Sequence, residues 1–254
     1  MTLVDHQLRD SGIHVLILQN KTVDNWFNID FIDSMNKALD TVENWIKDNS
    51  STPAALVTIS SNSKIYSNGL FLEQAFEKGS EYFLKFHHLL KRFLVFPIPT
   101  VAGNLVFTKF VAINGHAFAG GCMFSLCHDY RIMRGDKGFI CMNEVDLPSA
   151  LTPGMLSLVR CKVPMNALRD MIIQGHRFTA QEALENHFVD EIAPDSESVL
   201  PLAIHWAKKW SGKAKAGIIY GYLKEEMYVE AVRDLKNSKL GLVSIATGIP
   251  EAKL

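Results

Sequence analysis

The stretch at residues 111–121 reads V-A-I-N-G-H-A-F-A-G-G and lies at the centre of the predicted fold. Its apolar, β-branched start is typical of a buried strand, and Asn114-Gly115 is typical of the turn that ends one. The small residues at 119–121 predict the first turn of a helix whose backbone can come close to another molecule. Uncovered N–H groups at such a turn can bind an oxygen that gains negative charge. These residues therefore predict a strand, a turn and a helix around a ligand site.

Strand and helix patterns alternate on both sides of this stretch. β-rich runs indicate strands, and apolar side chains at helical spacing indicate helices between them. The predicted elements are strands at residues 13–19, 54–60, 130–134 and 138–142, and helices at residues 28–49 and after a cap at Ser80. The alternation predicts an α/β core at residues 1–194.

From Thr152 the pattern becomes mainly helical. Thr152-Pro153 predicts a helix cap followed by a first-turn proline, and T-A-Q-E at residues 179–182 predicts a capping box. The elements expected after them are a strand at residues 188–192 and two long helices at residues 196–210 and 215–237. Residues 195–254 are therefore expected to form a helical C-terminal extension.

Composition excludes several classes of protein. The chain has 254 residues, 48% of them hydrophobic, with 26 Lys+Arg against 27 Asp+Glu, which excludes disordered, collagen-like and coiled-coil chains. A formal net charge of −1 provides no general attraction for nucleic acid or an anionic membrane. The most apolar stretch, residues 93–107, is broken by prolines and is shorter than the roughly 20 residues of a membrane span. We expect a soluble enzyme or subunit, with no nucleic-acid partner and no membrane span.

The cysteines and the N-terminal residues indicate a reduced, intracellular protein. Cys122, Cys127, Cys141 and Cys161 form no C-x-x-C pair and are expected to be core thiols. No cluster of histidine, cysteine and aspartate has metal-ligand spacing, so no metal site is expected. The first twelve residues lack the basic and apolar regions of a secretory signal.

A second loop repeats the pattern of small residues after a strand. Residues 65–70 read I-Y-S-N-G-L, and taken singly each loop is as well explained by glycines that ease a tight turn. Two further segments make the set specific: H-D-Y-R-I-M-R-G-D-K-G-F-I-C-M-N-E-V-D at residues 128–146 and F-T-A-Q-E-A-L-E-N-H-F-V-D-E-I-A-P at residues 178–194. Over residues 13–194 the sequence resembles the crotonase superfamily, also called enoyl-CoA hydratase/isomerase. It is most similar to plant-type peroxisomal Δ3,Δ2-enoyl-CoA isomerases.

The resemblance implies a crotonase-like spiral of ββα units with a C-terminal extension that makes a homotrimer or hexamer. It implies an acyl-CoA thioester substrate and no separate cofactor, since CoA is part of the substrate. In the family, two backbone N–H groups bind the thioester oxygen, and here they fall on Leu70 and Gly120. Further substrate-binding positions are Lys64, Ser67, Asn68, Gly69 and Gly121. The lysines that could bind the CoA phosphates are Lys64, Lys208, Lys209, Lys213 and Lys215, and of these we favour Lys64, which precedes the first loop.

One pair of positions decides between the reactions of the family. Hydratases carry two glutamates, at positions that correspond here to Met123 and Glu144. Hydration needs a water that is both positioned and deprotonated, and Met123 can do neither. A single carboxylate suits a proton shuttle, in which Glu144 takes a proton from the carbon next to the thioester carbonyl and returns it to the γ carbon. The resemblance thus implies a Δ3,Δ2-enoyl-CoA isomerase of fatty-acid β-oxidation.

The shuttle requires Glu144 to have a pKa nearer the working pH than the ordinary value of about 4.3, which apolar neighbours can provide. Asp146 is the nearest competing acid, and capping or an ion pair explains it better. His116 is better explained by packing, because the family tolerates several residue types there. Asn68 and Asn114 are expected to form the turns.

Departures from the family pattern leave alternatives open. Residues 103–110 look inserted before the second loop: either they bulge out, or they replace the strand and endanger the oxyanion site. Phe71 removes a natural helix cap, and His187 stands where a glycine commonly ends a helix. The alternatives are a catalytically weak acyl-CoA binder or assembly subunit, an enoyl-CoA hydratase, or a thioester hydrolase.

The last three residues are Ala252, Lys253 and Leu254, a one-residue variant of the Ser-Lys-Leu peroxisomal address. Such an address is read by an import receptor. The tripeptide and the resemblance together lead us to expect that receptor as a partner and the peroxisome as the location.

Overall fold

The computed structural model describes residues 2–9, 12–20, 24–49, 52–96, 108–147, 149–216, 218–237 and 240–241. Its larger sheet has the strand order β1-β2-β3-β5-β7-β9, in which β1 is antiparallel to β2 and the other neighbours are parallel. A smaller parallel sheet has the order β4-β6-β8. The strands are β1 (Val4–Arg9), β2 (Ile13–Leu18), β3 (Ala55–Ser60), β4 (Ile65–Ser67), β5 (Thr108–Ile113), β6 (His116–Phe118), β7 (Tyr130–Arg134), β8 (Ile140–Cys141) and β9 (Glu191–Ala193).

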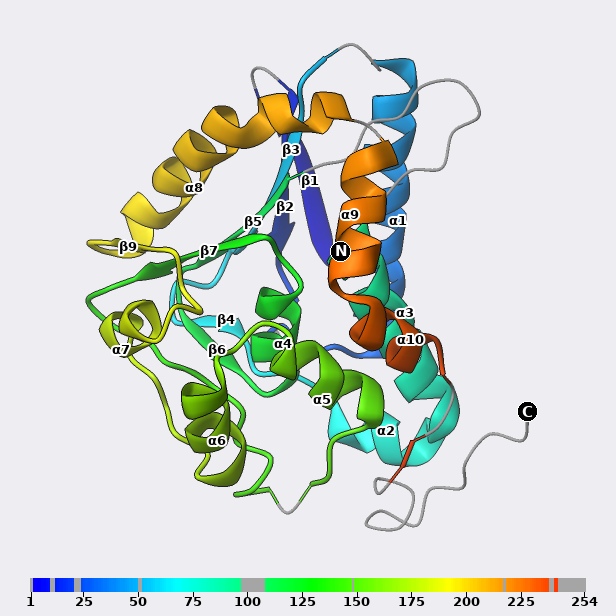
Figure 1. Cartoon of the computed structure of the whole chain (residues 1–254), viewed down its shortest axis with the longest axis vertical. Helices are drawn as coiled ribbons and strands as arrows, with labels where there is room; N and C mark the ends of the chain where they lie inside the picture. Colours follow the sequence, from blue (N-terminus) through cyan, green and yellow to red (C-terminus); the bar gives the residue numbers. More distant parts are fainter. Residues whose placement is uncertain are drawn as a thin grey trace.

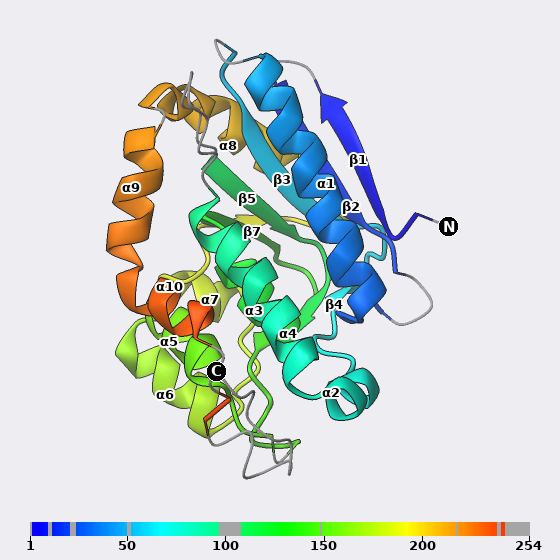
Figure 2. The ribbon, with the colours of Figure 1, turned by 90° about the vertical axis from the view of Figure 1, so that its right-hand side faces the viewer.

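Helices cover both faces of the larger sheet. β3 and β5 are buried along their whole length, which explains why most of their residues are apolar. α8 (Ser196–Trp210) packs on one face, and α1 (Ile29–Asp48) and α3 (Ser80–Val95) lie on the other (Figures 1 and 2). The chain is therefore an α/β protein with a layered core.

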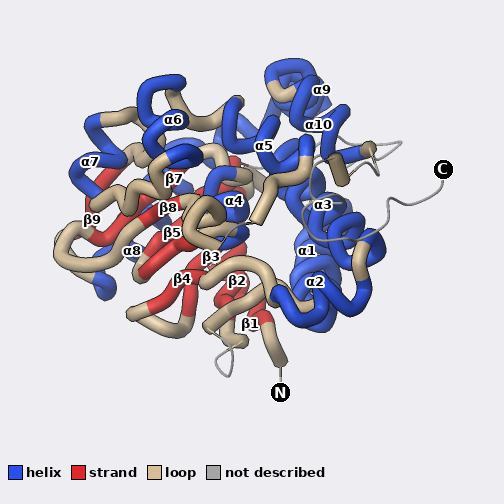
Figure 3. Tube along the Cα trace, turned by 90° about the horizontal axis from the view of Figure 1, so that it is seen from below, coloured by secondary structure: helices blue, strands red, loops and turns tan. Residues whose placement is uncertain are grey.

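The remaining helices lie around the smaller sheet and the edge of α3. They are α2 (Leu72–Lys78), α4 (Gly120–Leu126), α5 (Pro153–Arg160), α6 (Met165–Ile173), α7 (Ala180–Glu185), α9 (Ile218–Met227) and α10 (Val229–Lys236). α10 packs against α3 and α5, so the C-terminal helices return to the core. Figure 3 shows the strands of both sheets at the centre with helices around them. None of the helices in the described ranges is long and apolar enough to cross a membrane.

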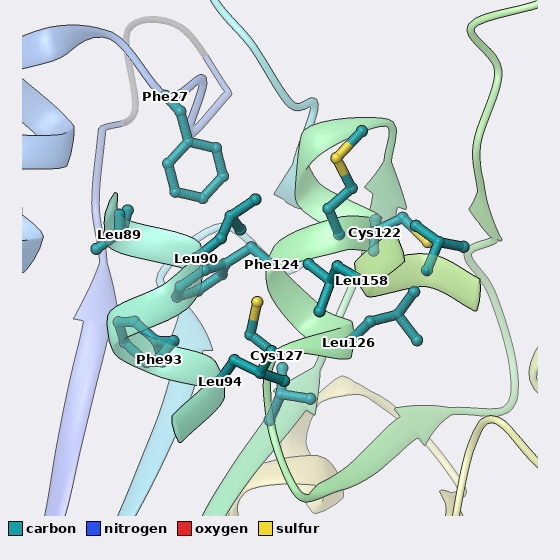
Figure 4. Packing of buried hydrophobic residues seen from close by; sticks show 14 of the residues in the cluster. Phe27, Leu89, Leu90, Phe93, Leu94, Cys122, Phe124, Leu126, Cys127 and Leu158 are labelled. Carbon is teal, nitrogen blue, oxygen red and sulfur yellow. The ribbon is translucent and has the colours of Figure 1, made fainter. Parts of the chain in front are cut away.

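α4 is buried on every side and forms the centre of the main core. The Phe124 ring meets the Phe93 ring of α3 edge-on, with 4.6 Å between centroids, and lies 5.2 Å from the Phe27 ring (Figure 4). Cys122, Cys127 and Cys141 are buried free thiols, as predicted. The prediction is wrong for Cys161, which is exposed at the C-terminal end of α5, where its Sγ donates to the Leu158 carbonyl.

Predicted helix starts are confirmed where a side chain caps the helix. Asn28 caps α1, and Thr152 caps α5 with Pro153 in the first turn. The capping box at residues 179–182 forms at the start of α7. Ser80, by contrast, is the first helical residue of α3 rather than its cap, a position held by Gly79 at φ 55°.

Other differences arise where tertiary contacts decide the structure. The helix expected at residues 215–237 is divided into α9 and α10, which meet at Tyr228. The strand expected at residues 188–192 is β9, which is shorter and begins three residues later. β1 was not predicted, because its half-exposed edge position allows a mixture of polar and apolar residues.

The extra segment before the second loop contributes to the sheet. Thr108, Lys109 and Phe110, the last three of residues 103–110, form the first half of β5 and pair with β3. The bulge alternative is therefore wrong for these three residues. Residues 103–107 lie outside the described residues. Gly120 is not displaced from the expected oxyanion site, because it lies beside Gly69 and Leu70 of the first loop.

Phe71 and His187 show the expected local effects. Phe71 makes no side-chain hydrogen bond at the start of α2. His187, after α7, has φ 59°, a left-handed conformation that glycine adopts more easily.

A buried group of charges attaches the C-terminal helices to the core. Lys224 of α9 lies 2.6 Å from the carboxylate of Asp129, and both side chains are buried. The same carboxylate accepts a hydrogen bond from the Lys109 N–H at 2.7 Å. The Lys109 ammonium donates to the carbonyls of Phe93 and Leu94 at the end of α3. These bonds join α3, β5 and α9.

Candidate active site

The two small-residue loops lie against each other. Gly69 has φ 91°, and a Cβ atom on it would lie 2.7 Å from the Gly120 nitrogen and 2.9 Å from the Phe118 carbonyl oxygen. A Cβ atom on Gly120 would lie 3.2 Å from the Leu70 nitrogen. Only glycine fits at Gly69, and the backbone amides of Leu70 and Gly120 are neighbours.

Both amides are available to a ligand. Leu70 forms a parallel bridge with Phe27 in which the Phe27 N–H donates to the Gly69 carbonyl at 2.8 Å. Such a bridge uses the groups on either side of Leu70 and leaves the Leu70 N–H on the other side. Gly120 is the first residue of α4, where an N–H has no partner within the helix. The preceding Ala119 has φ 50°, a strained conformation for a residue with a side chain.

Polar residues behind the loops hold them in place. The Ser67 hydroxyl donates to the Asn25 carbonyl at 2.8 Å and accepts from the Gly69 N–H at 3.1 Å. Asn114 bonds to both backbone groups of Ser60. Ser67 is fully buried, and a Cβ atom on Gly121 would lie 2.3 Å from its carbonyl oxygen. The positions predicted at Ser67 and Gly121 therefore lie behind the loops that face the ligand.

The loops open on a cavity of about 680 Å³, which we call the main cavity. Its volume is that of a site for a small molecule or cofactor. The predicted site residues Lys64, Asn68, Leu70 and Glu144 all lie in its wall, and so does His116, which was expected only to pack. Sequence reasoning missed Trp26, Phe71 and Phe118, which line it too. Phe118 and Phe71 lie within or next to the two quoted loops but were not assigned to the site, because aromatic residues are as common in cores as in binding sites.

Glu144 lies on the turn after β8, with its side chain directed into the site. The N–H groups of Leu147 and Ser149 fix the turn by donating to the Glu144 carbonyl at 3.1 and 3.0 Å. The carboxylate oxygen Oε2 is buried and has no hydrogen-bond partner in the described part of the chain. Burial raises the pKa of Glu144 from 4.5 to about 7. A carboxylate in this state can both accept and donate a proton near neutral pH.

Two smaller apolar cavities meet the main cavity at Glu144. The inner cavity, of about 30 Å³, is lined by Leu70, Met123 and Glu144 together with apolar residues of α2, α3 and α5. The outer cavity, of about 340 Å³, is lined by Glu144 and by residues such as Leu156 and Ile172. Met123 is fully buried and faces the same small space as Glu144. The position at which the resemblance implies a second carboxylate in hydratases is thus occupied by a thioether.

The other predicted polar residues have different surroundings. Asp146 is exposed and lies beside Gly175, away from the cavity wall. His116 stacks on Phe139 and contacts Phe118 at a tilted angle, as expected of a packing residue, and it also lines the main cavity. Lys64 is exposed at the cavity mouth. Lys208 and Lys209 lie at the end of α8 and Lys213 in the 3-10 turn after it, while the side chain of Lys215 lies outside the described residues.

Within the described ranges, no group of three or more histidine, cysteine, aspartate or glutamate side chains could hold a metal ion. The arrangement can bind a carbonyl oxygen at two N–H groups and move a proton next to it with one carboxylate.

Comparison with known proteins agrees with this arrangement. The model of the enoyl-CoA hydratase/isomerase family matches residues 9–240. Enoyl-CoA delta isomerase 3 of Arabidopsis thaliana is 31% identical over 192 residues, which cover 72% of this chain and 77% of the relative. The peroxisomal enoyl-CoA delta isomerase 2 of the same plant is 31% identical over 191 residues, covering 71% and 76%.

A solved structure shares the fold. The enoyl-CoA isomerase of Mycobacterium tuberculosis superposes with a TM-score of 0.79 at 22% identity, covering 96% of this chain and 98% of that one. The family model spans most of the chain, and the crotonase fold predicted from the sequence is confirmed. The chain belongs to the enoyl-CoA hydratase/isomerase family.

Proposed function

We propose that this protein is a Δ3,Δ2-enoyl-CoA isomerase of fatty-acid β-oxidation. The observation that carries the proposal is the pairing of Glu144 with Met123 across the inner cavity, next to the amides of Leu70 and Gly120. One carboxylate beside an oxyanion site suits proton transfer, whereas hydration needs a second group to activate water. The two plant relatives, whose names are those of delta isomerases, support the same reaction.

The reaction follows from the geometry. The thioester oxygen accepts hydrogen bonds from the N–H groups of Leu70 and Gly120. Glu144 removes a proton from C2, and the electron pair of that C–H bond moves toward the carbonyl to give a dienolate. The C3=C4 double bond then takes a proton from Glu144 at C4 while the C2=C3 double bond forms. The product is the trans-2-enoyl thioester, and Glu144 returns to its starting state.

Two features of the site lower the barrier. Each backbone donor to an oxyanion is worth on the order of 3 kcal/mol of transition-state stabilisation. Glu144 has a pKa near 7, so its carboxylate can accept the proton from C2 and its carboxyl group can donate the proton to C4. The apolar walls of the inner cavity also exclude water that would compete for the dienolate.

The alternative of a catalytically weak acyl-CoA binder or assembly subunit depended on a displacement of Gly120 by residues 103–110. Gly120 lies beside Leu70, so that argument no longer applies. The hydratase alternative is opposed by the apolar side chain of Met123.

The test is a comparison of two reactions catalysed by the purified protein. A 3-enoyl-CoA is assayed for conversion to the trans-2-enoyl-CoA, and a trans-2-enoyl-CoA is assayed for conversion to the 3-hydroxyacyl-CoA. We expect isomerisation to be much faster than hydration. Hydration at an equal or greater rate would identify a hydratase instead, and hydrolysis to free CoA would identify a thioester hydrolase.

We also propose that the protein acts in the peroxisome. Support comes from the peroxisomal name of one relative and from Ala252, Lys253 and Leu254, which lie outside the described residues. A fluorescent fusion at the N-terminus should co-localise with a peroxisomal marker, and deletion of the three residues should release it. Co-localisation with mitochondria would contradict the proposal.

We further propose a trimer or a hexamer, for which the exposed apolar side chains of Ile219, Tyr222 and Leu223 on α9 are suitable contacts. Light scattering of the purified protein tests this, and a stable monomer would contradict it.

A further inference from the structure

His116 lies between two cavities rather than inside a packed core. It is half-buried at the start of β6 and lines the main cavity together with Lys64. The same two residues line a second cavity of about 680 Å³, the side cavity, whose wall also includes Arg134 and Lys137. His116 does not line the inner cavity, where Glu144 faces Met123. It is therefore placed to bind the substrate at a distance from the reacting carbons.

The hydrogen bonds of His116 determine which ring nitrogen carries the proton. The backbone N–H of Phe139 points at Nδ1, with 3.2 Å between the nitrogens. A backbone N–H can only donate, so Nδ1 must accept with its lone pair. Burial and the charges of Lys64, Arg177 and Arg134 lower the pKa of His116, so the ring is neutral at pH 7. A neutral ring with an unprotonated Nδ1 carries its proton on Nε2.

The ring is held so that Nε2 faces the cavities. It stacks on Phe139, with centroids 5.6 Å apart, and lies 4.9 Å from the Phe118 ring. The bond to Phe139 fixes the Nδ1 edge toward β8, and Nε2 is on the opposite edge. No hydrogen-bond partner of Nε2 exists within the part of the chain that the structure describes, and the atom is not buried. An oriented N–H donor is thus available to a ligand.

The surroundings of this donor favour an anion. Arg134 is paired with Asp136 through two bonds of 2.7 and 2.6 Å, so its charge is balanced. Lys64 and Arg177 have no carboxylate within 4.0 Å in the described ranges. Arg177 lies over the Phe118 ring at 5.8 Å, and its charge is close enough to lower the pKa of His116. Two unbalanced cations and one neutral donor suit an anion with several acceptor oxygens.

We propose that His116, together with Lys64 and Arg177, binds a phosphate group of the CoA carrier through its Nε2–H. This inference rests on the proposed function, because it takes a CoA thioester as the substrate. His116 is a binding residue in this proposal and takes no part in the proton transfer. His116 lies four positions before Gly120 on the same strand–helix unit. The backbone from His116 to Gly120 therefore positions both the phosphate end of the carrier and the thioester.

The test compares His116→Phe with the wild type on two substrates. Phenylalanine keeps the stacking on its two aromatic neighbours and removes only the donor. One substrate is a 3-enoyl-CoA, and the other is the same 3-enoyl thioester of pantetheine, which lacks the nucleotide and its phosphates. We expect His116→Phe to raise the KM for the CoA thioester about ten- to hundredfold, as expected for the loss of a hydrogen bond to a charged group. The KM for the pantetheine thioester should not change.

Two further variants strengthen the test. His116→Gln restores an N–H donor and should recover much of the lost affinity. His205→Phe replaces an exposed histidine on α8 and should leave both substrates unaffected. A packing role alone would lower stability or raise the KM for both substrates equally, and either result would overturn the proposal.

A binding measurement separates this inference from the proposed reaction. Calorimetric titration with adenosine 3′,5′-bisphosphate and with CoA reports on the phosphate contacts without any turnover. The dissociation constant for both should rise in His116→Phe by a factor similar to that of the KM. If the wild type binds both ligands and the variant binds them equally well, the inference fails even when the isomerase activity is present. If the wild type isomerises no substrate but the variant binds the bisphosphate more weakly, the reaction assignment fails and the binding site stands.

Discussion

Replacement of Glu144 by glutamine should make the protein more stable at neutral pH. Burial raises the pKa of Glu144 from 4.5 to about 7, so the folded chain holds this proton more tightly than the unfolded chain does. The wild type therefore loses stability as the pH rises from about 4.5 to about 7, and the loss stays constant above that range. A pKa difference of about 2.5, at about 1.36 kcal/mol for each, gives about 3 kcal/mol at pH 8 and about 1 kcal/mol at pH 5. Glutamine cannot ionise and avoids this loss.

Urea unfolding at the two pH values measures the effect. Glu144→Gln should exceed the wild type in free energy of unfolding by about 1 kcal/mol at pH 5 and about 3 kcal/mol at pH 8. Asp146→Asn is the control, because Asp146 is exposed on the same turn and its replacement should give no advantage that grows with pH. A Glu144→Gln variant that is less stable than the wild type, or whose advantage is the same at both pH values, would refute the reasoning.

Three further replacements test other parts of the structure. Gly69→Ala should lower kcat/KM at least a hundredfold in the isomerase assay, because the new Cβ would lie 2.7 Å from the oxyanion amide; Gly212→Ala, where a Cβ would meet nothing within 4 Å, is the control. Lys224→Met should lower the free energy of unfolding by on the order of 3 kcal/mol, measured in urea, because it removes the one cation in the described ranges that pairs directly with the buried Asp129 carboxylate; an unchanged stability would contradict this. His187→Gly should raise the melting temperature through a gain of about 1 kcal/mol, because φ is 59° there, and a lower melting temperature would show that the side chain matters.

The parts of the fold that depend on local rules could be predicted from the sequence. Asn28, Thr152 and Thr179 each accept a hydrogen bond from the backbone N–H three residues later, so the helix starts that they mark depend on no distant contact. The buried strand β3 is also marked in the sequence, because a strand that is buried on both faces is rich in apolar residues.

Tertiary contacts decided the features that the sequence could not predict. β1 is an edge strand with one exposed side, so its polar residues hide the pattern. The division between α9 and α10 lies at Tyr228. The Lys162 ammonium lies over the Tyr228 ring in a cation–π contact, 4.1 Å from its centroid. The contribution of Thr108 to β5 also had no local signal, because nothing in the sequence marks the residue at which the strand that contains Val111 begins.

The candidate site shows the same division. Leu70, Gly120 and Glu144 were assigned to the site from family positions. The structure places Gly120 beside Leu70 and lines one cavity with Leu70 and Glu144, while the roles of the three residues stay predictions. The cavity position of His116 was missed, because a residue beside a turn can point either into the core or into a cavity. Only the backbone N–H of Phe139, the residue before β8, settles the direction.

The most direct test of the central claim is the rate of isomerisation by Glu144→Gln with a 3-enoyl-CoA substrate. If Glu144 transfers the proton, kcat should fall by a factor on the order of 10²–10⁴. KM should change little, because the carboxylate transfers the proton and does not contribute to substrate binding. The variant should remain folded and, at pH 8, be more stable than the wild type, so that loss of structure cannot explain the loss of rate. Isomerisation by the folded variant at a rate near that of the wild type would contradict the account and remove Glu144 from the mechanism.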